Sequence, residues 1–316
     1  MKKIALVAAL AAISASAFAQ SSVTLYGRIN TSVESQKVGN KDRVAVLQNN
    51  SSRIGFKGME DLGGGLKAGF VLEHGLNSDD GKQSQSAFWA RQSEVNLSGS
   101  FGTVRLGNWT PGSYYATADY VSMHNHDTGT SSDALYAGPF MTTNKVGYVS
   151  PDINGLRLEA EVHAGEGAAG EKRGYDFAAN YDQGPLHLGA GYSKQDQLQG
   201  GVFRDFNQFA VRGLYELGAF TVGGYYQRVE RGTDKKQNVY RLSGMYVMGA
   251  SEFHLNFGSA TKTNLIPKQD QFTLGYNYNL SKRTKVYGFY SMVDAKNTAN
   301  KAGDFSSLAA GIRHNF

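Results

Sequence analysis

The sequence predicts an all-β protein, a 16-stranded antiparallel transmembrane β-barrel, and three observations carry this prediction. Apolar and polar residues alternate with a period of two over many segments. Short turns alternate with longer polar loops along the chain. The last alternating segment ends on an apolar residue, Phe316, with no polar tail after it.

The alternation assigns two different faces to each predicted strand. Residues 156–163 place leucine, alanine and valine on one face, and residues 175–181 and 272–280 repeat the pattern. The opposite face of the first segment is polar and consists of Arg157, Glu159, Glu161 and His163. Such two-faced strands suit a sheet that separates an apolar environment from a polar one.

The connections between these strands are of two kinds. The predicted short turns lie at 60–65, 99–102, 151–155, 182–185, 216–219, 248–251 and 279–282. The predicted long loops lie near 35–45, 77–86, 109–142, 165–173, 195–205, 230–238, 261–270 and 295–304. Seven turns plus eight loops make fifteen connections, hence sixteen strands in one barrel domain.

A soluble β-sandwich is the main alternative fold, because it also has two-faced strands. Aromatic residues at the predicted strand ends favour the membrane, where they form interfacial girdles. These residues are Tyr148, Tyr181, Tyr215, Tyr246, Phe257 and Tyr278. The chain has no cysteine, which excludes disulfides and thiolate metal sites.

The N-terminus predicts export. A basic start, Met1-Lys2-Lys3, precedes an apolar run and then Ala17-Phe18-Ala19, which is the layout of a signal peptide. We expect residues 1–19 to be removed after Ala19, leaving 20–316 as a single barrel domain. Loss of two lysines changes the net charge from +5 to 5 − 2 = +3. Without any lysine or arginine run, this mild charge argues against a nucleic-acid partner.

Several motifs resemble those of the Gram-negative trimeric porins of the β-proteobacterial general type, and they span the whole chain. They are Ser22-Val-Thr-Leu-Tyr-Gly-Arg28, Ser52-Arg-Ile-Gly-Phe-Lys-Gly58, Glu60-Asp-Leu-Gly-Gly-Gly-Leu-Lys-Ala68, Phe101-Gly-Thr-Val-Arg-Leu-Gly107, Asn144-Lys-Val-Gly-Tyr-Val-Ser-Pro151 and Gly311-Ile-Arg-His-Asn-Phe316. One departure concerns the family's Gly-Arg-Gln, which reads Gly107-Asn108-Trp109 here. An arginine that often lies near the pore entrance is therefore absent.

The resemblance implies a homotrimer in the cell outer membrane, with a constriction formed by an inward-folded third extracellular loop. It implies contact with outer-membrane lipid and lipopolysaccharide, and no cofactor. It also implies that Phe316 is a signal for the barrel-assembly machinery.

The predicted third loop, residues 109–142, is the longest connection, and a loop of this length is usually functional or disordered. Its acidic residues are Asp119, Asp127 and Asp133, and its tyrosines include Tyr114, Tyr115 and Tyr120. His124 and His126 are also present, but two ligands at this spacing do not make a stable metal site, so we expect none.

A basic wall is predicted opposite this loop, because selectivity depends on the charge at the narrowest point of a pore. Alternation places Arg28 and Arg53 toward the lumen at mid-strand. Lys57, Lys67 and Arg105 face the lumen by the same rule. Alternation points Arg91 toward lipid, so a bulge or a position above the membrane is needed to include it.

The predicted function is passive diffusion of ions and small hydrophilic solutes with a weak preference for anions, and no enzymatic activity. One alternative is a porin selective for an anionic metabolite or a sugar, with the loop tyrosines as an aromatic track. Another is an outer-membrane barrel enzyme or an adhesin. No motif groups the seven histidines with a nucleophile, however.

Overall fold

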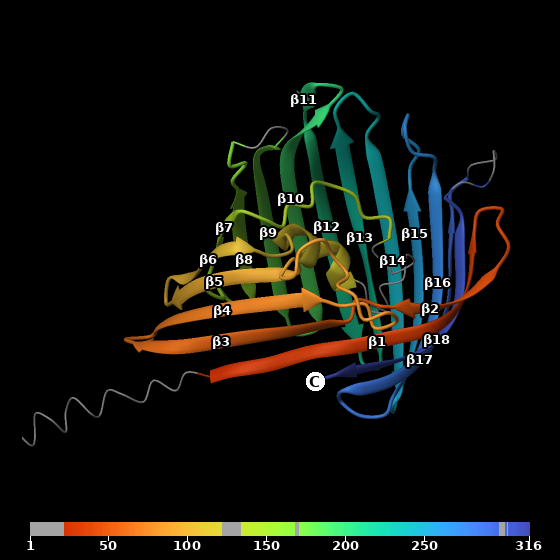
Figure 1. The fold of residues 1–316 in the computed structure, drawn as a ribbon, viewed down its shortest axis with the longest axis horizontal. Coiled ribbons are helices and arrows are strands. Elements are labelled where there is room, and N and C mark those ends of the chain that lie inside the picture. The colour runs from red at the N-terminus through yellow and green to blue at the C-terminus, as the bar shows by residue number, and fades with distance from the viewer. Residues whose placement is uncertain (1–21, 122–133, 168–170, 297–300, 302) are drawn as a thin grey trace, which may run out of the picture.

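The computed structural model describes residues 22–121, 134–167, 171–296, 301 and 303–316. It is a single closed antiparallel barrel with almost no helix (Figure 1). The predicted signal peptide, residues 1–19, lies outside the described residues.

The wall is built from eighteen strand segments, β1 to β18. These are β1 (Ser22–Val38), β2 (Val44–Asn49), β3 (Arg53–Gly63), β4 (Leu66–Gly75), β5 (Gln92–Gly99), β6 (Gly102–Asn108), β7 (Lys145–Val149), β8 (Leu156–His163), β9 (Glu171–Gln183), β10 (Leu186–Gln199), β11 (Val202–Arg204), β12 (Phe206–Leu217), β13 (Phe220–Arg231), β14 (Gln237–Met248), β15 (Ser251–Ala260), β16 (Gln269–Asn279), β17 (Thr284–Asp294) and β18 (Phe305–Asn315).

Two of the barrel strands are interrupted, which reconciles eighteen segments with the predicted sixteen strands. β2 and β3 both pair with β1, on either side of a break at 50–52. β11 and β12 both pair with β10, on either side of residue 205. Joining each pair gives 18 − 2 = 16 strands, which confirms the predicted fold class.

The barrel closes between its first and last strands. β1 pairs with β18 from Arg28–Asn315 to Val38–Phe305. At the end of this seam, the backbone N–H of Gly27 donates to the carbonyl of Phe316, and the N–H of Phe316 donates to the carbonyl of Gly27, both at 3.0 Å. The Phe316 ring occupies the space where a side chain at residue 27 would lie. Closure leaves no open sheet edge, as a membrane-spanning sheet requires.

The two faces of the wall differ as the alternation predicts. The outward face carries exposed apolar side chains, for example Val33, Leu242 and Leu308, because lipid replaces water there. The inward face is polar, with Asn30, Gln208 and Thr273 among its buried residues. No helix among the described residues has the length and apolar character needed to cross a membrane.

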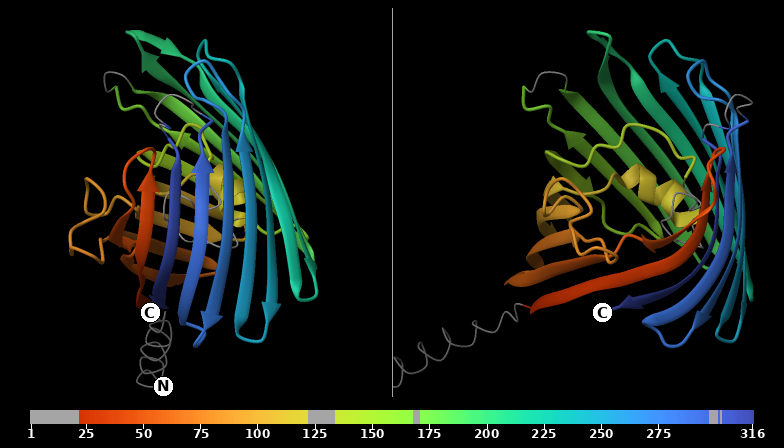
Figure 2. Two further views of the ribbon diagram at one scale, coloured as in Figure 1. Left: turned by 90° about the vertical axis from the view of Figure 1, so that its right-hand side faces the viewer. Right: turned by 45° about the vertical axis from the view of Figure 1, so that its right-hand side comes forward.

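The connections follow the predicted rhythm. Every predicted short turn joins two neighbouring strands at one end of the barrel, and the longer connections lie at the other end (Figure 2). The predicted loop near 195–205 is wrong in part, because β10 and β11 pair up to Gln199 and Val202 and leave only a tight turn between them. Gly63, Gly64 and Gly65 all have positive φ, so the turn between β3 and β4 depends on glycine.

Candidate pore constriction

The described parts of the third loop, residues 109–121 and 134–144, enter the barrel instead of extending over its surface. Its first part forms a short helix, α2 (Gly112–Tyr114), continued by a π-helical turn, η1 (Tyr115–Asp119). These turns lie inside the ring of strands (Figures 1 and 2) and pack against β8, β9, β10 and β12. Small residues allow this approach, since Ala116 and Ala118 are fully buried against the wall.

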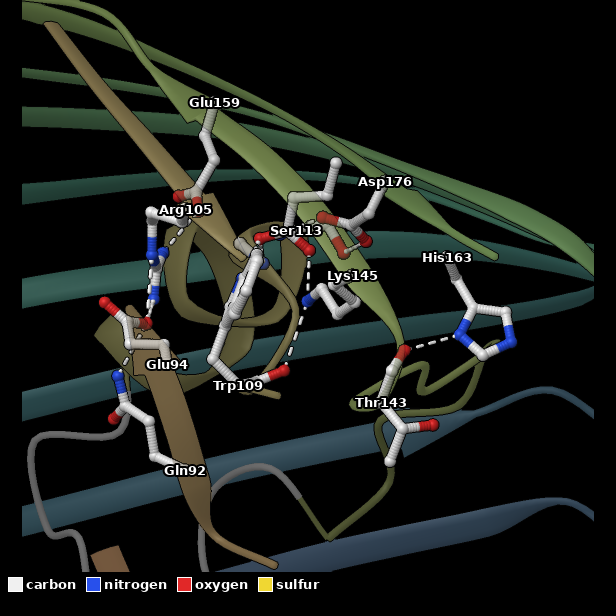
Figure 3. Close-up of polar contacts among 12 residues, drawn as sticks. Gln92, Glu94, Arg105, Trp109, Ser113, Thr143, Lys145, Glu159, His163 and Asp176 are labelled. Atoms are coloured by element: carbon white, nitrogen blue, oxygen red, sulfur yellow. Dashed lines mark hydrogen bonds and ion pairs between the residues drawn. The ribbon is translucent and has the colours of Figure 1, made fainter. Parts of the chain in front are cut away.

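Two carboxylates of the barrel wall hold the start of this loop (Figure 3). Glu161 on β8 accepts hydrogen bonds from the Trp109 indole Nε1 at 2.8 Å and from the Gly112 N–H at 3.2 Å. Asp176 on β9 accepts from the Ser113 N–H at 2.8 Å and from the Ser113 hydroxyl at 2.5 Å. The orphan N–H groups of the first helical turn are satisfied in this way.

The end of the helical turns is held by a second group on the wall. The Arg212 Nε donates to the Ala116 carbonyl at 2.7 Å, and its guanidinium lies 3.4 Å from the centre of the Tyr120 ring. The Tyr120 hydroxyl donates to Asp182 at 2.7 Å and lies 2.9 Å from the His187 Nδ1. Burial and the hydrogen bond to Asp182 raise the pKa of Tyr120 to about 12, so it stays neutral and anchors the loop without adding charge.

A cavity of about 260 Å³ lies between the loop and one side of the barrel wall. Three arginines line one side of it, and two tyrosines and an aspartate of the loop line the other. These six residues are Arg28, Arg53, Arg91, Tyr114, Tyr115 and Asp119. The structure therefore brings together residues that the sequence places on four separate segments. A larger hollow, about 600 Å³, lies on the outer apolar face, away from the solute path.

Two of the three cavity arginines, Arg53 and Arg91, share one carboxylate on the wall. Arg28 and Arg53 are direct cross-strand partners on β1 and β3, and the Arg28 Nε donates to the Ser51 carbonyl at 3.0 Å. Glu73 on β4 lies 2.7 Å from the Arg91 Nε and 3.8 Å from the Arg53 Nε. Counted together, the three arginines and Glu73 have a formal charge of 3 − 1 = +2.

Arg91 faces the lumen although the alternation of the following strand points it toward lipid. β5 begins at Gln92, so Arg91 is not part of the ladder and its direction is not set by the pleat. It belongs to the end of the second loop and turns inward toward Glu73. The sequence left open a bulge or a position above the membrane, and the pairing of β4 with β5 shows no bulge.

Two further cations extend the basic wall and were not among the predicted site residues. Arg313 on β18 pairs in register with Asn30 on β1 and with Lys285 on β17. The Lys285 ammonium lies 3.6 Å from Glu252. The sequence did contain a signal for Arg313, because Leu308 and Ile312 face out and residue 313 must then face in.

The remaining predicted cations lie outside the cavity. Lys57 and Lys67 are exposed on the lumen side nearer the short turns, and neither forms an ion pair with another described residue. Arg105 on β6 faces the lumen but is held by Glu94 at 2.6 Å and by Glu159 at 2.9 Å. Its charge is balanced locally, unlike that of the arginines on β1 and β3.

The wall behind the loop is rich in carboxylates. Lys145 on β7 forms an ion pair with Glu161, and both side chains are 1% exposed. Trp109 lies against two cations, with the Arg105 guanidinium 4.3 Å and the Lys145 ammonium 4.6 Å from its ring centre. The four carboxylates of this region outnumber its two cations. They are Glu161 and the three that Figure 3 labels, Glu94, Glu159 and Asp176. In the motif Gly107-Asn108-Trp109, Trp109 stands at the third position, next to the asparagine that replaces the arginine.

Not all predicted loop residues lie in the cavity. Tyr120 contacts Arg212, Asp182 and His187 and is separate from Tyr114 and Tyr115. Asp127 and Asp133 lie outside the described residues, as do His124 and His126. Among the residues that the structure does describe, no group of three histidine, aspartate or glutamate side chains could hold a metal ion.

Comparison with known proteins agrees with this geometry. The family model described as Gram-negative porin matches residues 5–298. The chain belongs to the Gram-negative porin family. It is 32% identical to outer membrane porin protein 32 of Delftia acidovorans and 28% identical to major outer membrane protein P.IB of Neisseria meningitidis, each match covering both chains completely.

Solved structures of porins share the fold. The anion-selective porin from Comamonas acidovorans superposes with a TM-score of 0.83 and 30% identity, over 94% of this chain and 100% of that chain. The porin described here is therefore an outer-membrane channel for passive diffusion, not an enzyme.

Proposed function

We propose that this porin prefers anions and that the cavity between the arginine wall and the third loop sets the preference. The observation that carries the proposal is the lining of this cavity, in which Arg28, Arg53 and Arg91 lie on the wall side and Asp119 on the loop side. The anion-selective porin from Comamonas acidovorans, which is 30% identical, supports the same direction.

The opposed charges would act as a transverse field. Guanidinium groups on β1, β3 and the second loop would attract an anion, and Asp119 would hold dipolar solutes across the opening. Tight binding is not needed, since conduction requires that each ion leaves as readily as it enters. Neutral Tyr114 and Tyr115 would add polar and apolar contact without changing the sign of the field.

The test is the reversal potential across a salt gradient in planar bilayers for wild type, Arg28→Ala and Arg53→Ala. One charge at about 8 Å in water is worth about 0.5 kcal/mol to a passing ion, with opposite signs for anions and cations, so each substitution should lower the anion-to-cation permeability ratio about fivefold. Arg228→Ala is the control, because that arginine is on β13 and exposed near Glu230 at 3.4 Å. An unchanged ratio in both cavity variants would refute the proposal.

A second candidate is a channel selective for an anionic sugar or metabolite. Tyr114 lies 5.7 Å from Tyr115 and 5.2 Å from Phe140, ring centre to ring centre, and all three line the cavity opposite the arginines. Such an aromatic side could stack on a sugar ring while the arginines hold its acidic group. Solute flux that saturates at low concentration would support this candidate, and a linear dependence would exclude it.

We also propose a homotrimer whose outer apolar face contacts outer-membrane lipid and lipopolysaccharide. The broad band of exposed apolar residues outside the barrel supports lipid contact. Cross-linking of the purified protein in detergent should yield a trimer; a monomer at all concentrations would contradict the proposal.

For export and assembly, we propose cleavage after Ala19 and recognition of Phe316 by the barrel-assembly machinery. The exposed ring of Phe316 on the outer side of the closing seam supports the second point. N-terminal sequencing should begin at Gln20. Phe316→Ala should lower the yield of folded barrel in membranes, and an unchanged yield would remove this role.

A further inference from the structure

The second loop, residues 76–91, connects β4 to β5 and supplies one of the three cavity arginines. We infer that Asn108 and Gly75 are positioning residues for Arg91, and that they make the second loop a determinant of ion selectivity. The inference rests on the proposed role of the arginine wall.

Asn108 holds the backbone directly before Arg91. This asparagine is the last residue of β6 and is 9% exposed. Its Nδ2 donates to the Ala90 carbonyl at 3.0 Å and to the Trp89 carbonyl at 3.3 Å. Both hydrogens of the amide are therefore used on the second loop. Because Arg91 is the next residue, these two bonds fix the point from which its side chain starts.

Gly75 leaves the space through which the Arg91 side chain reaches the lumen. It is the last residue of β4 and pairs in register with Arg53. A Cβ at this position would lie 3.0 Å from the Arg91 Cδ and 3.4 Å from its Cγ, and would also collide with the Ser84 hydroxyl. Gly75 is not among the glycines with positive φ, so the missing side chain, rather than backbone freedom, is what the site uses.

Glu73 completes the path by fixing the charged end. Its carboxylate lies 2.7 Å from the Arg91 Nε, on the same face of β4 as Gly75. Asn108 thus fixes the backbone before Arg91, Gly75 leaves room for its aliphatic part, and Glu73 pairs with its guanidinium. A long, flexible side chain on a loop becomes a charge at a defined place, next to Arg53.

The experiment compares the anion-to-cation permeability ratio of wild type, Arg91→Gln, Asn108→Ala and the double variant N108A/R91Q. Arg91→Gln should lower the ratio about fivefold, as expected for one charge near the ion path. Asn108→Ala keeps the charge but releases it, and should lower the ratio about twofold. In the double variant, the ratio should equal that of Arg91→Gln alone, because Asn108 acts only through Arg91.

Ser78→Ala is the matched control, since it also removes two side-chain hydrogen bonds that anchor the second loop. The Ser78 hydroxyl bonds to the Thr31 hydroxyl at 2.5 Å and to the Asn49 Oδ1 at 3.0 Å, at the other end of the loop. The anion-to-cation permeability ratio of Ser78→Ala should stay at the wild-type value. Gly75→Ala is a second test of the same path and should lower the ratio in wild type but not in Arg91→Gln.

Single-channel recording restricts the measurement to folded, inserted channels. The inference is overturned if Asn108→Ala and Gly75→Ala leave the ratio unchanged while Arg91→Gln lowers it. It is also overturned if Asn108→Ala lowers the ratio further in the Arg91→Gln background, or if Ser78→Ala has the same effect. The inference also fails if Arg91→Gln leaves the permeability ratio unchanged, because Arg91 then has no effect that Asn108 and Gly75 could support. Arg28→Ala and Arg53→Ala test the proposed function independently of that result.

Discussion

The two sides of the lumen carry the same types of charged residue but use them differently. On the β1, β3 and second-loop side, three arginines line the cavity, and two of them, Arg53 and Arg91, share Glu73. On the β5 to β9 side, two cations and four carboxylates are packed behind the third loop. An excess of positive charge beside the cavity makes the first set a field, whereas ion pairs and hydrogen bonds to the third loop make the second set an anchor. Each prediction below tests one side of this comparison.

The largest expected effect is on the anchor side. Lys145→Met leaves Glu161 buried without its cation, which should lower the free energy of unfolding by about 3–5 kcal/mol. Urea unfolding in detergent, followed by tryptophan fluorescence, measures this change. Lys268→Met is the control, because its ion pair with Asp270 is exposed and should be worth less than about 1 kcal/mol. Equal small effects would mean that the buried pair is not an anchor.

Arg105 and Arg53 provide a direct comparison between the sides. Arg105→Gln leaves Glu94 and Glu159 without a cation and should cost about 3 kcal/mol of stability with little change in selectivity. Arg53→Gln should do the reverse, because Arg91 still pairs with Glu73 when Arg53 is neutral. Unfolding and reversal-potential measurements on both variants check the prediction. A selectivity change in Arg105→Gln as large as in Arg53→Gln would break the distinction.

A moderate effect is expected from the hydroxyl that holds the helical turns. Ser113→Ala removes the donor 2.5 Å from a buried Asp176 oxygen and should cost about 1–3 kcal/mol. Ser251→Ala removes an exposed hydroxyl near Tyr276 and serves as the control. Unfolding in urea distinguishes them, and identical midpoints would show that Asp176 does not secure the loop.

The smallest expected effect is on the loop side of the field. Asp119→Asn removes one negative charge from the cavity and should raise the anion-to-cation permeability ratio about twofold to fivefold, which corresponds to about 0.4–1 kcal/mol. Asp42→Asn, an exposed residue of the first loop, is the control and should leave the ratio unchanged. A lower ratio in Asp119→Asn would reverse the proposed direction of the field.

The local pattern of the sequence determines the strands, their two faces and the positions of the turns. A strand's side chains alternate whatever its neighbours are, so Arg28 and Arg53 can be assigned to the lumen from their own segments. The same rule assigns Arg313 to the lumen, because Leu308 and Ile312 face out.

Only the tertiary structure decides which of these charges remain available to a solute. Whether Arg105 is neutralised depends on which carboxylates the closed barrel brings beside it, and these come from β5 and β8. Tyr120 anchors the loop because the helical turns end there, against Arg212. Arg91 lies before its strand begins, so no periodic pattern sets its direction. Periodicity is a property of the backbone over a few residues, whereas charge pairing depends on register between strands and on where a loop folds.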